Sequence, residues 1–93
     1  IICRYGGEEF IVVLPETDRK SAEERAEQIR REVENELKLD LNDTSPKITV
    51  SIGISTFPLN GQNYTSLIDA ADKALYQAKA NGRNQSVVAG QYN

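Results

Sequence analysis

Residues 1–14, IICRYGGEEFIVVL, decide how this chain folds. Two strand-like apolar runs, Ile1–Tyr5 and Glu8–Leu14, flank the pair Gly6-Gly7. Two glycines between such runs are typical of a tight hairpin, because the favoured two-residue turns need positive φ angles. The second run is almost continuously apolar, which suits a strand covered on both faces. The stretch therefore predicts a β-hairpin that ends at Pro15.

A helix is predicted next, with Thr17 or Asp18 as its N-cap and its end near Leu37. Its apolar residues recur every three or four positions, which places them in one narrow stripe. The stripe consists of Ala22, Ala26, Ile29, Val33 and Leu37. Most other positions are charged, with Glu27 and Arg31 at a helix-supporting spacing, and we interpret them as a solvated face. Residues 37–41 alternate and could add a short strand.

The second half of the chain predicts a strand, a second helix and a last short strand. Residues 47–57 alternate in polarity, and Gly53 inside this run indicates that another group approaches closely. Asn63 can cap the second helix, and Gly82 is typical of a left-handed helix end. Residues 84–89 could form the last strand. This order of elements favours an α/β fold with an antiparallel-rich sheet flanked by helices over a repeated β-α-β unit.

The composition excludes several classes of protein. The 93 residues make at most one small domain, and the net charge of −3 gives no strong basic field for a nucleic-acid polymer or an anionic membrane. The absence of histidine excludes Ser-His-Asp and Cys-His nucleophile systems, and the single cysteine, Cys3, excludes an internal disulfide. Any chemistry must therefore use carboxylates, Lys, Arg, backbone amides and hard cations.

The first candidate site is the predicted hairpin tip. Gly6 and Gly7 expose backbone without a Cβ, so a phosphate or nucleotide could lie close to their amides. Strand alternation sends Glu8 and Glu9 to opposite faces, so one of them could bind Mg²⁺ together with substrate phosphates. The residues alone leave open the alternative that this is an ordinary hairpin with charged residues beside its turn.

The second candidate site is the end of the second predicted helix. Asp72, Tyr76 and Lys79 fall on one side of that helix, and Arg83 follows one turn beyond. Lys79 and Arg83 could converge on an anionic group such as a triphosphate. The alternative is a solvated basic helix end that complements the helix dipole.

Together, these stretches resemble the GGDEF family, the diguanylate cyclase catalytic domain. Three motifs occur in the family's order and cover nearly the whole chain: RYGGEEF at residues 4–10, ITVSIGI at 48–54, and ADKALYQAK with GRN between 71 and 84. The first is similar to the GGEEF form of the family signature. The resemblance implies a nucleotidyl-cyclase, palm-like fold, with residues 1–93 as the C-terminal portion of a single domain.

The resemblance also implies roles for the hairpin residues. Gly6 and Gly7 would form the turn under the phosphates of GTP. Glu8 would ligate Mg²⁺ or Mn²⁺ and act as the base that activates the 3′-hydroxyl. Glu9 would assist the metal site or hold the hairpin geometry.

For the second site, the resemblance implies that Lys79 and Arg83 contact the phosphates. The implied reaction joins two GTP molecules into cyclic di-GMP with loss of two pyrophosphates. Each half-site holds one GTP, so a homodimer would be needed. A GGDEF-like module that binds GTP or cyclic di-GMP without turnover is the alternative, but the intact Glu8, Lys79 and Arg83 favour the enzyme.

Further expectations concern the rest of the protein. We interpret residues 1–93 as a piece of a longer chain with an upstream sensory or receiver domain, acting in the cytoplasm even if the whole protein is membrane-anchored. The family's first strand, its metal-binding Asp, its guanine-reading segment and its inhibitory R-x-x-D motif fall outside this piece, so we expect it to be inactive alone. Gln28 stands where some members carry a product-binding Arg. The resemblance implies that the family's first strand lies in mid-sheet. We therefore expect an open edge along a strand such as 8–14 or 47–57, which pairs or exchanges strands with a second copy, or else an upstream segment that supplies the strand.

Overall fold

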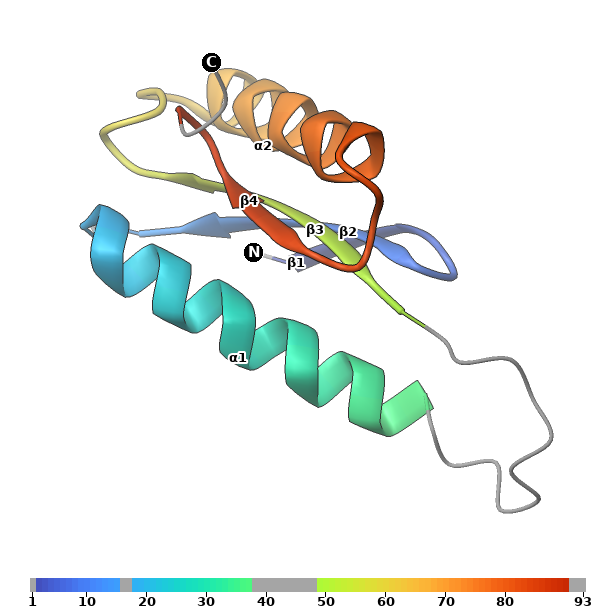
Figure 1. Ribbon diagram of the computed structural model, residues 1–93. Helices are drawn as coiled ribbons and strands as arrows, with labels where there is room; N and C mark the ends of the chain where they lie inside the picture. The colour runs from blue at the N-terminus through green and yellow to red at the C-terminus, as the bar shows by residue number, and fades with distance from the viewer. Residues whose placement is uncertain (1, 16–17, 38–48, 91–93) are drawn as a thin grey trace, which may run out of the picture.

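The computed structural model describes residues 2–15, 18–37 and 49–90, which form four strands and two helices (Figure 1). The strands build one sheet in the order β1-β2-β3-β4, and the two helices lie on opposite faces of it. The elements are β1 (Ile2–Gly6), β2 (Glu9–Leu14), α1 (Arg19–Leu37), β3 (Ser51–Thr56), α2 (Tyr64–Ala80) and β4 (Ser86–Val88). Thr17 lies outside the described residues. So does the possible strand at 37–41, except for Leu37, which is the last residue of α1.

The predicted α/β class, a sheet flanked by helices, is confirmed. β1 and β2 pair antiparallel, whereas β2 with β3 and β3 with β4 pair parallel. Among the described strands, antiparallel pairing is thus less extensive than the sequence indicated and joins only β1 and β2 of the hairpin. The reason is that α1 and α2 each return the chain to the same end of the sheet, and such helical crossovers connect parallel strands.

The hairpin forms as predicted, but its turn lies one residue later. Gly6 pairs with Glu9, so Gly7 and Glu8 are the two turn residues. The strand register is irregular between Arg4 and Gly6, which absorbs the extra residue on β1.

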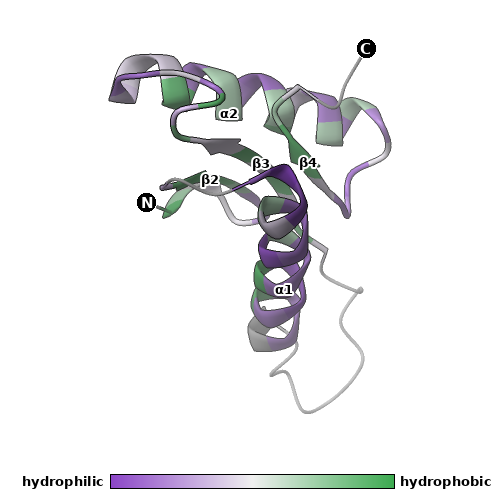
Figure 2. Cartoon of the chain, turned by 90° about the vertical axis from the view of Figure 1, so that its left-hand side faces the viewer, coloured by the Kyte–Doolittle hydropathy of each residue, from purple (hydrophilic) through white to green (hydrophobic). Residues whose placement is uncertain are grey.

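α1 begins where the sequence predicted. The Asp18 carboxylate accepts a hydrogen bond from the Ser21 backbone N–H at 2.7 Å, which is N-cap geometry. Ala22, Ala26 and Ile29 are buried against the sheet, and the hydrophilic residues cover the remaining surface of the helix (Figure 2). The apolar stripe therefore joins α1 to one face of the sheet.

β3 is buried along its whole length between the two helices. Ile52 and Ile54 pack in the cluster that includes the stripe of α1. Gly53 faces α2, and a Cβ built on it would overlap the carbonyl oxygen of Ala71 and the backbone nitrogen of Leu75. The predicted close approach at Gly53 is confirmed, and the approaching group is the backbone of α2.

The open edge expected at residues 8–14 or 47–57 is not found in the described part of the chain. β2 lies between β1 and β3, and β3 lies between β2 and β4, so neither strand is an edge of the described sheet. The expectation was wrong because β2 and β3 pair directly with each other. The edges of the described sheet are β1 and β4.

α2 packs on the opposite face of the sheet from α1 (Figure 1). Its N-cap is Asn63, whose side chain accepts a hydrogen bond from the Ser66 backbone N–H at 2.8 Å. One side of the helix is buried, through Leu67, Ala71, Ala74, Leu75 and Ala78. Among the described residues, neither helix is long and apolar enough to cross a membrane.

Candidate active site

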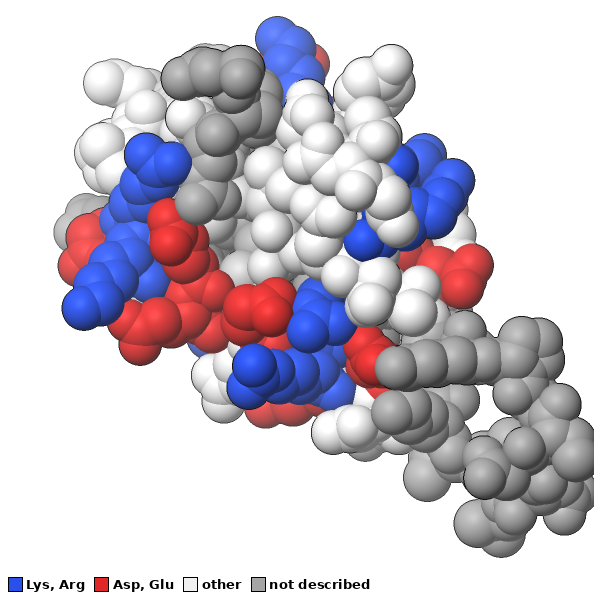
Figure 3. Space-filling model, viewed as in Figure 1, with Lys and Arg blue, Asp and Glu red and all other residues white. Residues whose placement is uncertain are grey.

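The two candidate sites lie next to each other. Lys79 Nζ donates to Oε1 of Glu9 at 3.2 Å, and Arg83 Nη1 lies 3.5 Å from Oε2 of the same carboxylate. Figure 3 shows basic side chains over the end of α2 beside acidic ones over the tip of the hairpin. Lys79 and Arg83 thus converge on one anionic group, which in this structure is the carboxylate of Glu9 and not the triphosphate that the sequence suggested.

This ion-paired cluster is accessible to solvent. The side chains of Glu9, Lys79 and Arg83 are 29%, 34% and 54% exposed. The hydrogen bond from Lys79, aided by Arg83, lowers the pKa of Glu9, so the carboxylate is ionised at neutral pH. Accessible ion pairs contribute only about 0–1 kcal/mol each, so a more highly charged anion can replace the carboxylate at little cost.

Local backbone geometry places Arg83 beside the end of α2. Gly82 has a φ of +115°, and its N–H donates to the Lys79 carbonyl, while the Arg83 N–H donates to the carbonyl of Ala78 at 2.9 Å. These two bonds form a Schellman motif, which confirms the predicted left-handed helix end. Arg83 and Asn84 also have positive φ angles, of 64° and 50°. The chain therefore turns sharply after α2 and brings Arg83 next to the helix end that carries Lys79.

Glu8 lies in the hairpin turn and is exposed. Its carbonyl accepts a hydrogen bond from the Ser51 N–H at 2.9 Å, which fixes the turn to the start of β3. The described residues contain no group of three or more His, Cys, Asp or Glu that could hold a metal ion. Mg²⁺, however, keeps several waters and needs only one or two protein carboxylates beside substrate phosphates. Glu8 fits that requirement as one ligand, whereas Glu9 is engaged by two cations.

Gly6 has open space beside it. A Cβ at this position would meet no atom within 4 Å, and its φ lies outside the left-handed range. The described structure therefore leaves room beside the turn at Gly6.

A second link joins the hairpin to α2. The Asp72 carboxylate accepts a hydrogen bond from the Tyr5 hydroxyl and, together with burial, raises the pKa of Tyr5 to about 12. Tyr76, on the same predicted side of α2, is 72% exposed. The contribution of Tyr5 could not be read from the sequence, because no spacing rule connects a strand residue to a helix so far along the chain.

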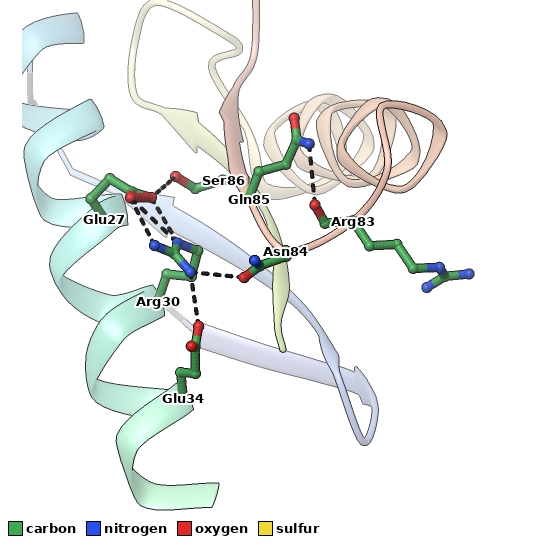
Figure 4. A network of polar contacts seen from close by, with 7 residues as sticks. All are labelled: Glu27, Arg30, Glu34, Arg83, Asn84, Gln85 and Ser86. Atoms are coloured by element: carbon green, nitrogen blue, oxygen red, sulfur yellow. Dashed lines mark hydrogen bonds and ion pairs between the residues drawn. The ribbon is translucent and has the colours of Figure 1, made fainter. Parts of the chain in front are cut away.

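A network of polar contacts joins α1 to the segment after α2 (Figure 4). Arg30 Nε donates to Glu27 at 2.9 Å, and Arg30 Nη1 donates to Glu34 and to Asn84 Oδ1, both at 2.9 Å. The side chain of Arg30 is only 16% exposed. Interpreting the charges of α1 as a solvated face was therefore wrong for this residue. The ion-pair partner of Glu27 is Arg30 rather than the predicted Arg31. The i,i+3 spacing of Glu27 and Arg30 could have indicated this pair from the sequence.

Comparison with known proteins identifies the family. The model of the family described as "Diguanylate cyclase, GGDEF domain" matches residues 1–85. The chain is 44% identical to Diguanylate cyclase A of Treponema denticola, over 89% of this chain and 22% of the relative. It is 41% identical to Response regulator PleD of Caulobacter vibrioides (91% and 19% covered) and 42% identical to Diguanylate cyclase DosC of Escherichia coli (90% and 18%). It thus spans about a fifth of the length of these curated relatives, and no solved structure matches it. The chain belongs to the GGDEF family of diguanylate cyclase domains.

Proposed function

We propose that this chain is part of a diguanylate cyclase that joins two GTP molecules into cyclic di-GMP and releases two pyrophosphates. The observation that carries the proposal is the meeting of Lys79 and Arg83 with Glu9 at the tip of the glycine hairpin. Two cations, an exposed carboxylate at Glu8 and open space beside Gly6 are thereby gathered at one end of the sheet. Phosphoryl transfer needs this combination, since catalysis rests on positioning and on neutralising phosphate charge.

Lys79 and Arg83 would bind the phosphates of GTP. The triphosphate of GTP carries more charge than a single carboxylate, and the Arg guanidinium can form two parallel hydrogen bonds with a phosphate group. The phosphate would therefore replace Glu9 as the main partner of both cations. Before GTP binds, Glu9 keeps the two side chains together, which lowers the cost of ordering them.

Glu8 would act at the reacting centre. Its carboxylate would ligate Mg²⁺ or Mn²⁺, an ion that neutralises charge on the phosphates and polarises the reacting phosphorus. In each half-reaction the 3′-oxygen of one GTP forms a bond to the α-phosphorus of the other, and the bond to pyrophosphate breaks. The proton of the 3′-hydroxyl would pass to a carboxylate oxygen of Glu8. Gly6 and Gly7 would leave their backbone open to the phosphates.

The wider context follows from the same proposal. A cyclic product with two phosphodiester bonds needs two bound GTP molecules, so two copies of the domain would have to meet face to face. We further propose that a regulatory domain lies elsewhere in the protein, because the curated relatives extend well beyond the matched region. The reaction would take place in the cytoplasm, where GTP is available.

Replacement of Glu8 by Ala in the whole protein tests this proposal. Loss of the metal-binding carboxylate should lower the rate of cyclic di-GMP formation by about a thousandfold or more. Glu24→Ala, at an exposed position on α1, is the matched control and should leave the rate unchanged. Product formation by Glu8→Ala close to the unmodified rate would refute the catalytic assignment.

A further inference from the structure

The segment between α2 and β4 has an unusual backbone. Gly82, Arg83 and Asn84 are three successive residues with positive φ, at 115°, 64° and 50°. Residues other than glycine disfavour this region, although Asn tolerates it better than most. Such a conformation persists only where surrounding contacts hold it in place. The contacts of this segment therefore decide where the Arg83 side chain lies.

Contacts of this kind come from Gln85, whose Nε2 donates to the Arg83 carbonyl at 3.2 Å, and from α1. Arg30 Nη1 donates to Asn84 Oδ1 at 2.9 Å, and the Ser86 hydroxyl donates to Glu27 Oε2 at 3.1 Å. The guanidinium is itself held by two carboxylates, since Nε and Nη2 donate to Glu27 at 2.9 and 3.1 Å and Nη1 donates to Glu34 at 2.9 Å. With so little exposure of its side chain, Arg30 is a fixed donor rather than a mobile surface charge.

Neighbouring side chains of the segment point in opposite directions. In Figure 4, Asn84 and Ser86 point toward the cluster on α1, whereas the guanidinium of Arg83 points away from it. On that other side Arg83 reaches Glu9. Asn84 directly follows Arg83 in this turn, so the hydrogen bond from Arg30 holds the backbone next to Arg83.

We propose that Arg30 is a positioning residue for the nucleotide site, acting through Asn84 on Arg83. The inference rests on the proposed function, because it assigns Arg83 to the phosphates of GTP. Glu27 and Glu34 hold the guanidinium, and its remaining hydrogen bond sets the turn that presents Arg83. α1, which lies on the opposite face of the sheet from α2, thereby contributes to the affinity for GTP.

Two replacements of Asn84 in the whole protein separate positioning from folding. Asn84→Gly removes the acceptor for Arg30 but keeps the positive φ accessible, whereas Asn84→Asp keeps a side-chain oxygen as acceptor. We expect Asn84→Gly to raise the KM for GTP about tenfold, the loss that corresponds to one charge-assisted hydrogen bond, with a much smaller change in kcat. Asn84→Asp should stay within about twofold of the unmodified protein.

A double-mutant cycle tests the route of the effect. Arg30→Gln should raise the KM by a similar factor, and Arg30→Gln combined with Asn84→Gly should raise it no further, because both remove the same contact. Arg19→Gln, in an exposed ion pair at the other end of α1, is the control and should change nothing. Additive effects of the two replacements, or equal KM values for Asn84→Gly and the unmodified protein, would overturn the proposal.

Amide hydrogen exchange provides a readout that does not need activity. In nucleotide-free protein, Asn84→Gly and Arg30→Gln should speed exchange at residues 82–85 about tenfold while leaving the first turns of α2 unchanged. Unchanged exchange at residues 82–85 would refute the inference even if the protein made cyclic di-GMP. Conversely, an unmodified protein that makes no cyclic di-GMP would refute the proposed function, and the exchange result would still decide whether Arg30 fixes the segment.

Discussion

Gly53→Ala is the replacement whose effect on stability follows most directly from the structure. The added methyl would overlap the carbonyl oxygen of Ala71 and the backbone nitrogen of Leu75. Neither atom can rotate aside as a side chain could, so α2 must move away from β3 as a unit. Overpacking of a core costs about 1–3 kcal/mol, and the backbone obstacle puts this case at about 3 kcal/mol. That is a large part of the 5–15 kcal/mol that stabilises a typical domain.

Hydrogen exchange in the whole protein measures this loss where it occurs. A destabilisation of about 3 kcal/mol should lower the protection of the amides of β3 and α2 about a hundredfold. Gly6→Ala is the matched control, because its Cβ would meet no atom within 4 Å and its φ is not positive. Gly6→Ala should change stability by less than about 0.5 kcal/mol, yet lower cyclase activity by filling the space proposed for a phosphate. Unchanged protection in Gly53→Ala would show that α2 does not lie against β3 as described.

Three further predictions concern single side chains. Asn63→Ala removes the cap that accepts from Ser66 and should cost about 1 kcal/mol, measured by denaturant unfolding; an unchanged midpoint would contradict the cap. The hydrogen bond from Arg30 lowers the pKa of Glu27 below its ordinary 4.5, so the stability it contributes is complete above that value and lost as the pH falls through the lowered pKa. The free energy of unfolding, measured from about pH 6 to pH 3, should therefore fall less in Glu27→Gln than in the unmodified protein. Parallel curves of this free energy against pH would refute the assignment. Lys79→Ala should raise the KM for GTP about tenfold or more in steady-state kinetics, and an unchanged KM would remove it from the phosphate site.

Features with a local physical cause could be predicted from the sequence. The caps at Asp18 and Asn63 and the helix end at Gly82 each depend on residues within one turn, so the side-chain type alone indicates them. Gly53 was also predictable, because a glycine inside an alternating strand has few explanations other than a close contact. The α/β class followed from the order of these elements.

Features that depend on which elements become neighbours could not be predicted in this way. Alternation indicates that one face of a strand is buried but not which strand lies beside it, so the parallel pairing of β2 with β3 was missed. The partner of Lys79 and Arg83 could not be predicted for the same reason, since Glu9 lies 70 positions from Lys79 in the sequence. Arg30 has the spacing of a surface charge on α1, but in the folded chain its guanidinium also contacts Asn84, and its side chain is only 16% exposed.

The assignment of Glu8 and Glu9 shows how the two levels combine. The sequence predicted both residues in one strand, on opposite faces, whereas the structure places Glu8 in the exposed turn and Glu9, the first residue of β2, between two cations. The sequence could not show which of the two carboxylates remains accessible to a metal ion. The contacts of Glu9 with α2 favour Glu8 for that role.

Product analysis after incubation of the whole protein with GTP and Mg²⁺ tests the central claim most directly. Mass spectrometry of the reaction should detect cyclic di-GMP, and a pyrophosphate assay should detect two pyrophosphates for each molecule formed. GTP that binds to the protein but is recovered unchanged would contradict the account, because Glu8, Lys79 and Arg83 would then form a binding site without turnover.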